Sequence, residues 1–320
     1  MDIDLVYFWV DGSDPLWLAK KLAYTSAFDE KTQTNCKARY IGNDELKYSL
    51  RSVDKYAPWI HKIFIVTDNQ IPEWLNVFHP KIKIIDHREI LPSEILPCFN
   101  STVLEYFLYC IPDLSEHFLY ANDDMFFNAH LSPDFFFTKK GHPIVRLKKK
   151  NLVKFRYRFK KVFGFGIKTG HYRNMVFEAA LLIEKKWGKF YSGIPHHNID
   201  AYAKSDYQHA VQEIFKEQVK VSQLNRIRMD GDLHRSAFAF YMLAIGHGNL
   251  RYVKLKESLL IRANNPNFMR YFLRYRPLLF CLNDFQDVTD KDRTRIKPFL
   301  EKLFPEKSQF ENILLQPVVN

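Results

Sequence analysis

The chain has 320 residues, of which 47% are hydrophobic and 16% aromatic, enough for the core of one large α/β domain. Its four cysteines include no CxxC pair, and a chain of this length does not need a disulfide framework, so we expect free thiols in a reducing compartment. The start carries no charged-then-apolar leader, and the longest apolar run has nine residues, Ala237 to Ile245. The sequence therefore predicts a soluble, cytoplasmic protein and excludes a membrane-spanning one.

The net charge of +11 is concentrated in one segment, because the stretch between Asp134 and Glu178 contains thirteen Lys or Arg and no acid. We expect the rest of the chain to be nearly neutral. Such a basic segment attracts phosphates, anionic glycans or the inner face of an anionic membrane, where it would give peripheral contact. A solvated loop is the alternative. The basic residues are Lys139, Lys140, Arg146, Lys148, Lys149, Lys150, Lys154, Arg156, Arg158, Lys160, Lys161, Lys168 and Arg173.

In chain order, short apolar runs alternate with segments of helical periodicity, which predicts a doubly wound, mostly parallel α/β sheet. The predicted strands span residues 3–10, 62–67, 81–86, 117–121 and 278–282. The predicted helices span residues 43–57, 102–110 and 290–303, and Thr102 and Glu105 have the spacing of a capping box. We expect one catalytic domain over residues 1–320, with an insertion at about 139–220.

Ligands of doubly wound sheets bind beyond the carboxyl ends of the strands, and polar residues gather there in this sequence. They include Asp11, Asp68, Asp86 and the cluster Asn122-Asp123-Asp124. Adjacent carboxylates repel each other unless a cation lies between them, and hard oxygen ligands suit Mg²⁺ or Mn²⁺. An ordinary turn is the alternative, since this tripeptide is common in turns.

Each of three further motifs has two possible interpretations, one chemical and one structural. The opening strand and its turn could hold a nucleotide through Asp4, Trp9 or Asp11, or could be plain core. His171 could be a general base or a surface histidine, whereas we expect the adjacent His196 and His197 to form a loop, because neighbouring side chains point apart. Arginines Arg226 and Arg228 could bind a diphosphate through their planar forks or form a local ion pair.

Taken together, these motifs resemble the Stealth family of capsular polysaccharide phosphotransferases, which includes N-acetylglucosamine-1-phosphotransferase. The resemblance covers nearly the whole chain. It is carried by IDLVYFWVDGSD (residues 3–14), by NDELKYSLRSVDKYAPWIHKIFIVTDNQIPEWL (43–75), by LSEHFLYANDDMFF (114–127) and by CLNDFQD (281–287). In the third block of the family, His171 lacks the proline that usually follows two residues later.

The resemblance implies a GT-A-like fold, a divalent cation, a UDP-sugar donor and a glycan or polysaccharide acceptor, with no nucleic acid as a partner. It places Asp4, Trp9 and Asp11 near the nucleotide and Glu105 and Asp124 at the catalytic centre. It also implies roles for His171 as base and for Arg226 at the diphosphate, with Arg228 as the alternative register. Metal binding falls to Asp124, assisted by Asp123 or Asn122.

The resemblance thus predicts transfer of a hexose-1-phosphate, N-acetylhexosamine-1-phosphate in particular, from a UDP-sugar to a glycan hydroxyl, with release of UMP. The product is a phosphodiester of a capsular or cell-surface polysaccharide. One alternative is a metal-dependent glycosyltransferase that releases UDP. Another is a non-catalytic module that binds anionic glycan or membrane, which would leave the carboxylates at the strand ends without a purpose.

Overall fold

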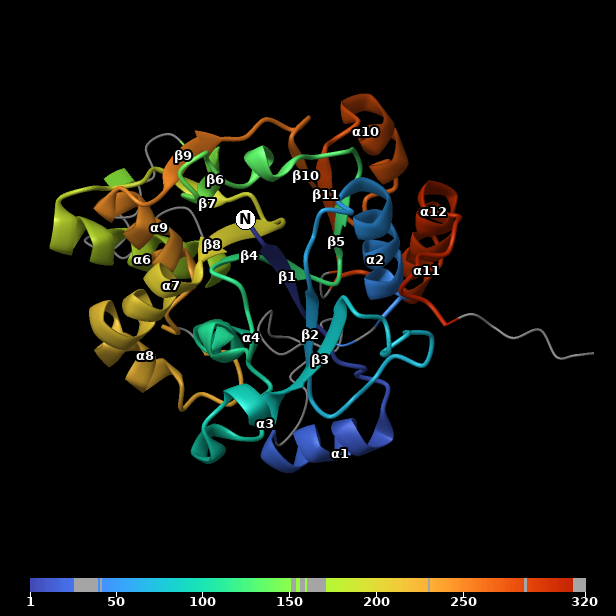
Figure 1. Cartoon of the computed structure of the whole chain (residues 1–320), viewed down its shortest axis with the longest axis horizontal. Helices are drawn as coiled ribbons and strands as arrows, with labels where there is room; N and C mark the ends of the chain where they lie inside the picture. The colour runs from blue at the N-terminus through green and yellow to red at the C-terminus, as the bar shows by residue number, and fades with distance from the viewer. Residues whose placement is uncertain are drawn as a thin grey trace, which may run out of the picture.

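The computed structural model describes residues 1–25, 40, 42–150, 154–155, 159, 171–229, 231–284 and 287–312, with the backbone alone for His171. At its centre lies a five-stranded sheet in the order β3-β2-β1-β4-β8 (Figure 1). Four of these strands run parallel, and β8 is antiparallel to β4 at the edge. The strands are β1 (Ile3–Phe8), β2 (Ile63–Thr67), β3 (Ile82–Asp86), β4 (His117–Asn122) and β8 (Asp200–Ala203).

Helices cover both faces of this sheet, and the alternation of side chains along β1 explains why the strand is apolar throughout. Leu5 and Tyr7 pack into one hydrophobic cluster, together with α2 (Glu45–Tyr56), while Val6 packs into the cluster on the other face. That second cluster contains α4 (Ser101–Tyr106), α6 (His171–Trp187) and α9 (Ser236–Ile245). The predicted doubly wound, mostly parallel α/β architecture is confirmed.

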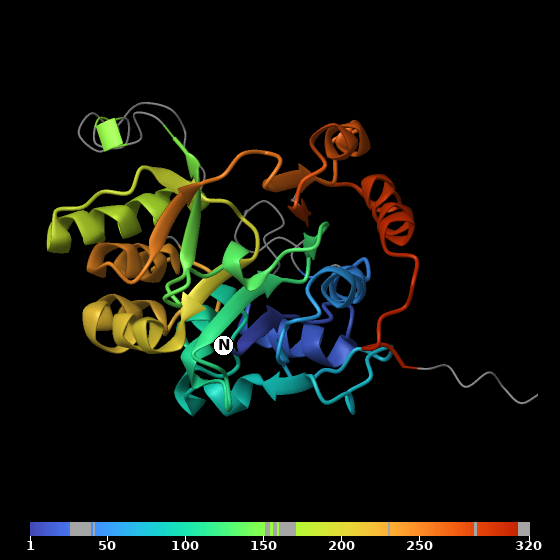
Figure 2. The same ribbon diagram turned by 45° about the horizontal axis from the view of Figure 1, so that its top comes forward.

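Two smaller sheets flank the central one, as Figure 2 shows. The first has the order β10-β11-β5, and the second has the order β7-β6-β9. Their strands are β5 (Met125–Phe127), β6 (Ile144–Lys149), β7 (Gly193–Pro195), β9 (Asn249–Tyr252), β10 (Ser258–Arg262) and β11 (Leu279–Asn283). Within the segment 139–220, which we expect to be an insertion, β8 belongs to the central sheet.

The remaining helices are short. They are α1 (Pro15–Tyr24), α3 (His87–Ile90), α7 (Lys204–His209), α8 (Lys216–Ser222), α10 (Phe268–Tyr275), α11 (Asp290–Arg293) and α12 (Ile296–Leu303). The helix predicted over 290–303 is thus two helices, α11 and α12. None of the helices in the described part of the chain combines the length and apolarity needed to cross a bilayer.

The capping box expected at Thr102 and Glu105 is wrong. The residue before the helix, Asn100, caps α4 by accepting a hydrogen bond from the Thr102 amide at 3.1 Å. Glu105 therefore lies inside the helix, where it is buried rather than turned back to the helix start. Its side chain is available for other partners, which are described below.

Candidate active site

The carboxyl ends of β1 and β4 lie side by side, because Phe8 pairs with Asn122 in the parallel register. The turn that follows β1 is fixed to the segment after β2 through Gln70. Its side-chain oxygen accepts from the Asp11 amide at 2.9 Å, and its amide group donates to the Asp11 carbonyl at 3.0 Å. Trp9 donates its backbone N–H to Val66 at 3.0 Å and packs, partly buried, against the core. Two of the three expected nucleotide residues therefore share this edge.

The structure does not bring the third, Asp4, to the same edge. Asp4 lies at the amino end of β1 and is fully buried. Its carboxylate accepts from the backbone amides of Lys62 at 3.0 Å and Ser115 at 2.7 Å, and it lies 2.9 Å from the ring of His61. These contacts tie together three chain segments and give Asp4 a structural role.

The charges of three carboxylates beyond β4 raise one another's pKa, and we call these residues the acid cluster: Glu45, Asp123 and Asp124. None has a basic hydrogen-bond partner among the described residues. Burial, and then the charge of Asp123, raise the pKa of Glu45 to about 7. Burial and the charge of Asp124 raise the pKa of Asp123, and burial also raises that of Asp124. Carboxylates this close together retain protons that ordinary acids lose, unless a positive charge arrives. Glu45 is a member that the sequence pattern did not single out.

Asp124 is held in place by β11. Its Oδ2 accepts from the Cys281 thiol at 3.2 Å and from the Asn283 amide at 3.3 Å, and its carbonyl accepts from the Leu282 N–H at 2.9 Å. Its other carboxylate oxygen, Oδ1, is buried and has no hydrogen-bond partner. An orphaned carboxylate oxygen is costly in a folded protein and marks a place for a ligand.

His197 lies beside the same asparagine, with its Nε2 at 3.4 Å from Asn283 Nδ2. The edge of the Tyr172 ring packs against it, with centroids 5.8 Å apart. Burial, and then the positive charges of Arg235 and Lys148, lower the pKa of His197 to about 3, so its ring is neutral at pH 7. His196 and His197 lie in the loop between β7 and β8, as the sequence predicts, and their rings contact different partners, Asp200 and Asn283.

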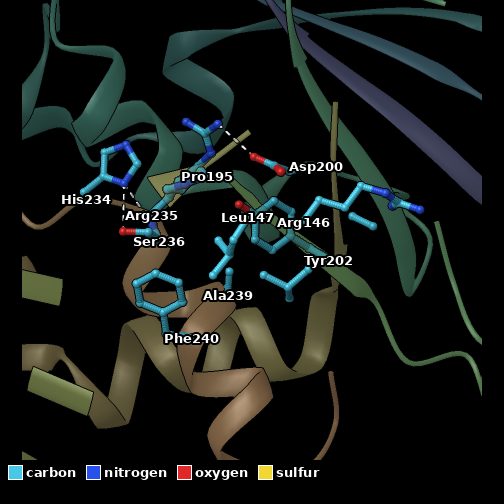
Figure 3. Close-up of a pocket in the computed structure, with 12 residues that line it drawn as sticks. Arg146, Leu147, Pro195, Asp200, Tyr202, His234, Arg235, Ser236, Ala239 and Phe240 are labelled. Atoms are coloured by element: carbon cyan, nitrogen blue, oxygen red, sulfur yellow. Dashed lines mark hydrogen bonds and ion pairs between the residues drawn. The ribbon is translucent and has the colours of Figure 1, made fainter. Parts of the chain in front are cut away.

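His196 belongs to a second group, a buried chain of charges that we call the arginine network: Glu105, Arg235, Asp200 and His196. Arg235 donates to Glu105 Oε1 at 2.8 Å and to Asp200 Oδ2 at 3.1 Å. Asp200 Oδ1 in turn lies 3.2 Å from the His196 ring. Figure 3 shows Arg235 pointing at Asp200 across a pocket between β6, β8 and the start of α9. Arg235 has no motif around it, and only its place before the apolar helix α9 could have drawn notice.

Charge pairing lowers a carboxylate pKa in this network, whereas the pKa values in the acid cluster are raised. Burial works to raise the pKa of Asp200, but the hydrogen bond from His196 and the charge of Arg235 outweigh it and hold that pKa below its ordinary value. The Tyr120 hydroxyl joins the network to the edge of the sheet, since it lies 3.2 Å from Glu105 Oε1 and 3.0 Å from Asn122 Oδ1. Glu105 and the Asn122-Asp123-Asp124 cluster are thus parts of one site.

The two candidate arginines point to different places. Arg226 donates to the Glu94 carbonyl at 3.0 Å, and its guanidinium lies 5.0 Å from the centre of the Tyr24 ring. Arg228 donates to the Ser101 hydroxyl at the start of α4, the helix that carries Glu105.

The loop that carries these arginines is fastened by Asn100, whose amide donates to the carbonyls of Asn225 and Ile227 and to the Asp232 carboxylate.

His171 is the first residue of α6, and its side chain lies outside the described part of the structure. Its neighbour Tyr172 contacts His197, so the start of α6 is close to the site. Five of the thirteen basic residues of the 139–173 segment also lie outside the described residues: Arg156, Arg158, Lys160, Lys161 and Lys168. Within the segment, Lys154, Phe155 and Phe159 are helical.

Comparisons with known proteins show the family of this chain. The model described as "Stealth protein CR1, conserved region 1" matches residues 1–29, and "Stealth protein CR2, conserved region 2" matches residues 39–145. A capsular polysaccharide phosphotransferase of Haemophilus influenzae is 35% identical over 300 residues, covering 88% of this chain and 78% of that protein. One of Actinobacillus suis is 34% identical over 295 residues, covering 89% and 77%.

The chain belongs to the Stealth family. It is a transferase, as the sequence predicts. A receptor polysaccharide phosphotransferase of Streptococcus oralis is 29% identical over 97% of this chain and 99% of its own length. Among solved structures, galactosyltransferase LgtC in complex with donor and acceptor sugar analogues overlaps 95% of this chain and 96% of that chain, with a TM-score of 0.46 and 13% identity.

The acid cluster of this Stealth protein fits a divalent cation that shares its coordination with a substrate. Across the described residues, no group of three or more His, Cys, Asp or Glu side chains converges as a complete metal site. Mg²⁺, however, is usually held by one or two carboxylates together with waters and substrate phosphates. Asp123 and Asp124 supply such carboxylates, and the orphaned Asp124 Oδ1 supplies an unused oxygen.

Proposed function

We propose that the chain transfers a hexose-1-phosphate, in particular N-acetylhexosamine-1-phosphate, from a UDP-sugar to a hydroxyl of a capsular or cell-surface glycan, and releases UMP. The observation that carries this proposal is the acid cluster beyond β4. Its carboxylates lack a counter-charge and share the sheet edge with the turn after β1, and Asn283 connects Asp124 to the neutral His197. That arrangement suits a diphosphate and the cation that accompanies it.

In the proposed reaction, the acceptor oxygen attacks the phosphorus that bears the sugar, and the bond from that phosphorus to the bridging oxygen breaks. UMP leaves with the bridging oxygen, and the acceptor proton passes to a base. We assign this base to His197, with His171 as the alternative. Nearby anions raise the pKa of a histidine, so the bound diphosphate would make the neutral His197 ring a better proton acceptor.

Asp124 would hold Mg²⁺ or Mn²⁺, with Asp123 or Asn122 assisting, and this cation would neutralise charge on the phosphoryl oxygens. Glu105 is fixed by Arg235 and Tyr120, so it can accept a hydrogen bond from the acceptor or the sugar without having to reorient. One of Arg226 and Arg228 would bind the diphosphate. The basic segment at 139–173 would hold an anionic acceptor, and nucleic acid is not proposed as a partner.

A donor labelled with ³²P at the phosphorus next to the sugar separates this reaction from glycosyl transfer. Sugar-phosphate transfer puts the label into the glycan and releases unlabelled UMP, whereas glycosyl transfer leaves the label in UDP. We expect labelled glycan from a panel of UDP-sugars with wild-type protein and none with Asp124→Asn. Labelled UDP as the product would instead establish an ordinary glycosyltransferase.

A further inference from the structure

A second basic stretch lies outside the segment at 139–173. Between Asn249 and Asn283 the chain has seven Lys or Arg and a single acid, Glu257. The expectation that the positive charge is confined to one segment is therefore wrong. All seven basic side chains are exposed: Arg251, Lys254, Lys256, Arg262, Arg270, Arg274 and Arg276.

Large apolar side chains are exposed over the same stretch. Of the seventeen exposed large hydrophobic residues in the described structure, six fall within residues 250–273, and each is between 38% and 68% exposed. They are Leu250, Tyr252, Leu255, Met269, Tyr271 and Leu273. We call the seven cations and these six side chains the 250–276 face.

Helix α10 explains why its apolar residues on this face are not core residues. Phe268 and Phe272 form its buried stripe, and both rings pack on Phe299 with centroids 5.1 Å apart. Met269 and Leu273 lie one position further along, at the same helical spacing, and are exposed. The helix is thus anchored by one apolar stripe and presents a second one to solvent.

The face is continuous with the first basic segment. Strand β9 pairs in parallel with β6, whose last residue, Lys149, lies with its ammonium group 5.8 Å from the centre of the Tyr252 ring. In Figures 1 and 2 the chain from β9 to α10 runs along the upper border of the molecule. Within the face, Arg251 forms an ion pair with Glu257 at 2.8 Å.

We propose that the 250–276 face docks this protein on an anionic lipid surface. Cations alone would suit any polyanion, but a polysaccharide offers no hydrocarbon for the Met269 and Leu273 side chains. Interspersed arginines, tyrosines and aliphatic residues match the boundary between anionic headgroups and acyl chains. None of the thirteen side chains of the face belongs to the acid cluster or the arginine network, so docking would keep the enzyme at a membrane without using its catalytic groups.

The test is co-sedimentation of the full chain with vesicles of phosphatidylcholine, with and without phosphatidylglycerol. We expect binding only to the anionic vesicles, and weaker binding at high salt. The double variant Arg270→Gln/Arg274→Gln should lower the partition coefficient about fivefold for each charge removed. Met269→Ser/Leu273→Ser should also lower it, while leaving its salt dependence unchanged.

Helix α8 and the turn that follows it offer matched controls on another part of the molecule, where Lys216, Lys220, Val221 and Leu224 are also exposed. Lys216→Gln/Lys220→Gln and Val221→Ser/Leu224→Ser should leave vesicle binding unchanged, and a thermal melt confirms that each variant folds. Equal losses in the α8 variants would overturn the proposal. So would unchanged binding of Met269→Ser/Leu273→Ser, because cations would then suffice.

Discussion

The acid cluster and the arginine network lie in one site, but only the carboxylates of the arginine network have a cationic partner within the protein. In the arginine network, Arg235 lies between Glu105 and Asp200, and each carboxylate has a positive partner. In the acid cluster, the neighbours of Asp124 are a thiol and an amide, which do not outweigh burial, so the pKa of Asp124 is raised.

This difference separates positioning from binding. A buried carboxylate with a built-in cation is already neutralised and can orient other groups. A buried carboxylate without such a cation is stabilised most when a bound ligand supplies the positive charge that the fold does not provide. Variants in each group test this difference, and removal of the cation of the arginine network has the largest expected effect.

Removing the built-in cation should have the largest effect on folding. Arg235→Met leaves Glu105 and Asp200 buried without their cation, which should lower the free energy of unfolding by about 3–5 kcal/mol. Urea denaturation measures it. Lys297→Met breaks a more exposed pair with Asp44 and should cost less than about 1 kcal/mol. A variant at Arg235 as stable as the wild type would show that the network does not hold the fold.

Asp124→Asn should have the reverse profile, with a large loss of activity and no loss of stability. If Asp124 holds the cation, turnover should fall about a thousandfold, since the charge of a metal stabilises a transition state by several kcal/mol. Replacing one of several repelling carboxylates should leave the melting temperature unchanged or raise it. Release of UMP, measured with and without excess chelator, tests this, and full turnover in the chelator would contradict it.

Glu45 should make stability depend on pH. Its pKa is about 7 when folded and ordinary when unfolded, so its contribution is complete below pH 4.5 and is lost as pH rises to 7, by about 3 kcal/mol. His87 and His197 contribute in the opposite direction, because burial lowers their pKa values to about 4 and 3. The measurement is therefore the difference in the free energy of unfolding between wild type and Glu45→Gln at each pH, without divalent cations. A difference that stays constant from pH 4.5 to 7 would refute the assignment.

Activity measurements on single variants distinguish the two candidate bases, His197 and His171. His197→Ala should lower transfer to the acceptor at least about a hundredfold while leaving UDP-sugar binding nearly intact, because a base acts on the acceptor proton. His171→Ala is the matched variant at the start of α6 and should have a smaller effect. The opposite result would return the role to His171. If both variants keep near-normal turnover and the rising limb of the pH profile falls near pH 4–5, a carboxylate such as Glu105 is the base.

The parts of this site that the sequence could predict are those set by local pattern. Apolar runs that end in acids place β1, β2, β3 and β4 within about two residues, and the same pattern leads to Asp124. Glu105 and Arg235 lie 130 residues apart, so no local spacing signals their contact. His197 was missed for a related reason, because its partner Asn283 comes from a strand 86 residues further on.

The smallest expected effects concern Arg226 and Arg228, the two candidates for binding the diphosphate. The sequence favoured Arg226, but Arg228 contacts α4 next to Ser101, whereas Arg226 lies on Tyr24. The charge of Arg228 also helps to lower the pKa of His234, in the lining of the pocket that Arg235 borders. We therefore expect Arg228→Lys to reduce turnover about tenfold or more, because lysine keeps the charge and loses the planar fork that matches a phosphate. Arg226→Lys should mainly weaken UDP-sugar binding, which separate measurement of kcat and KM detects. Equal, mild effects at both positions would mean that neither arginine touches the diphosphate, and that the cation at the acid cluster neutralises it alone.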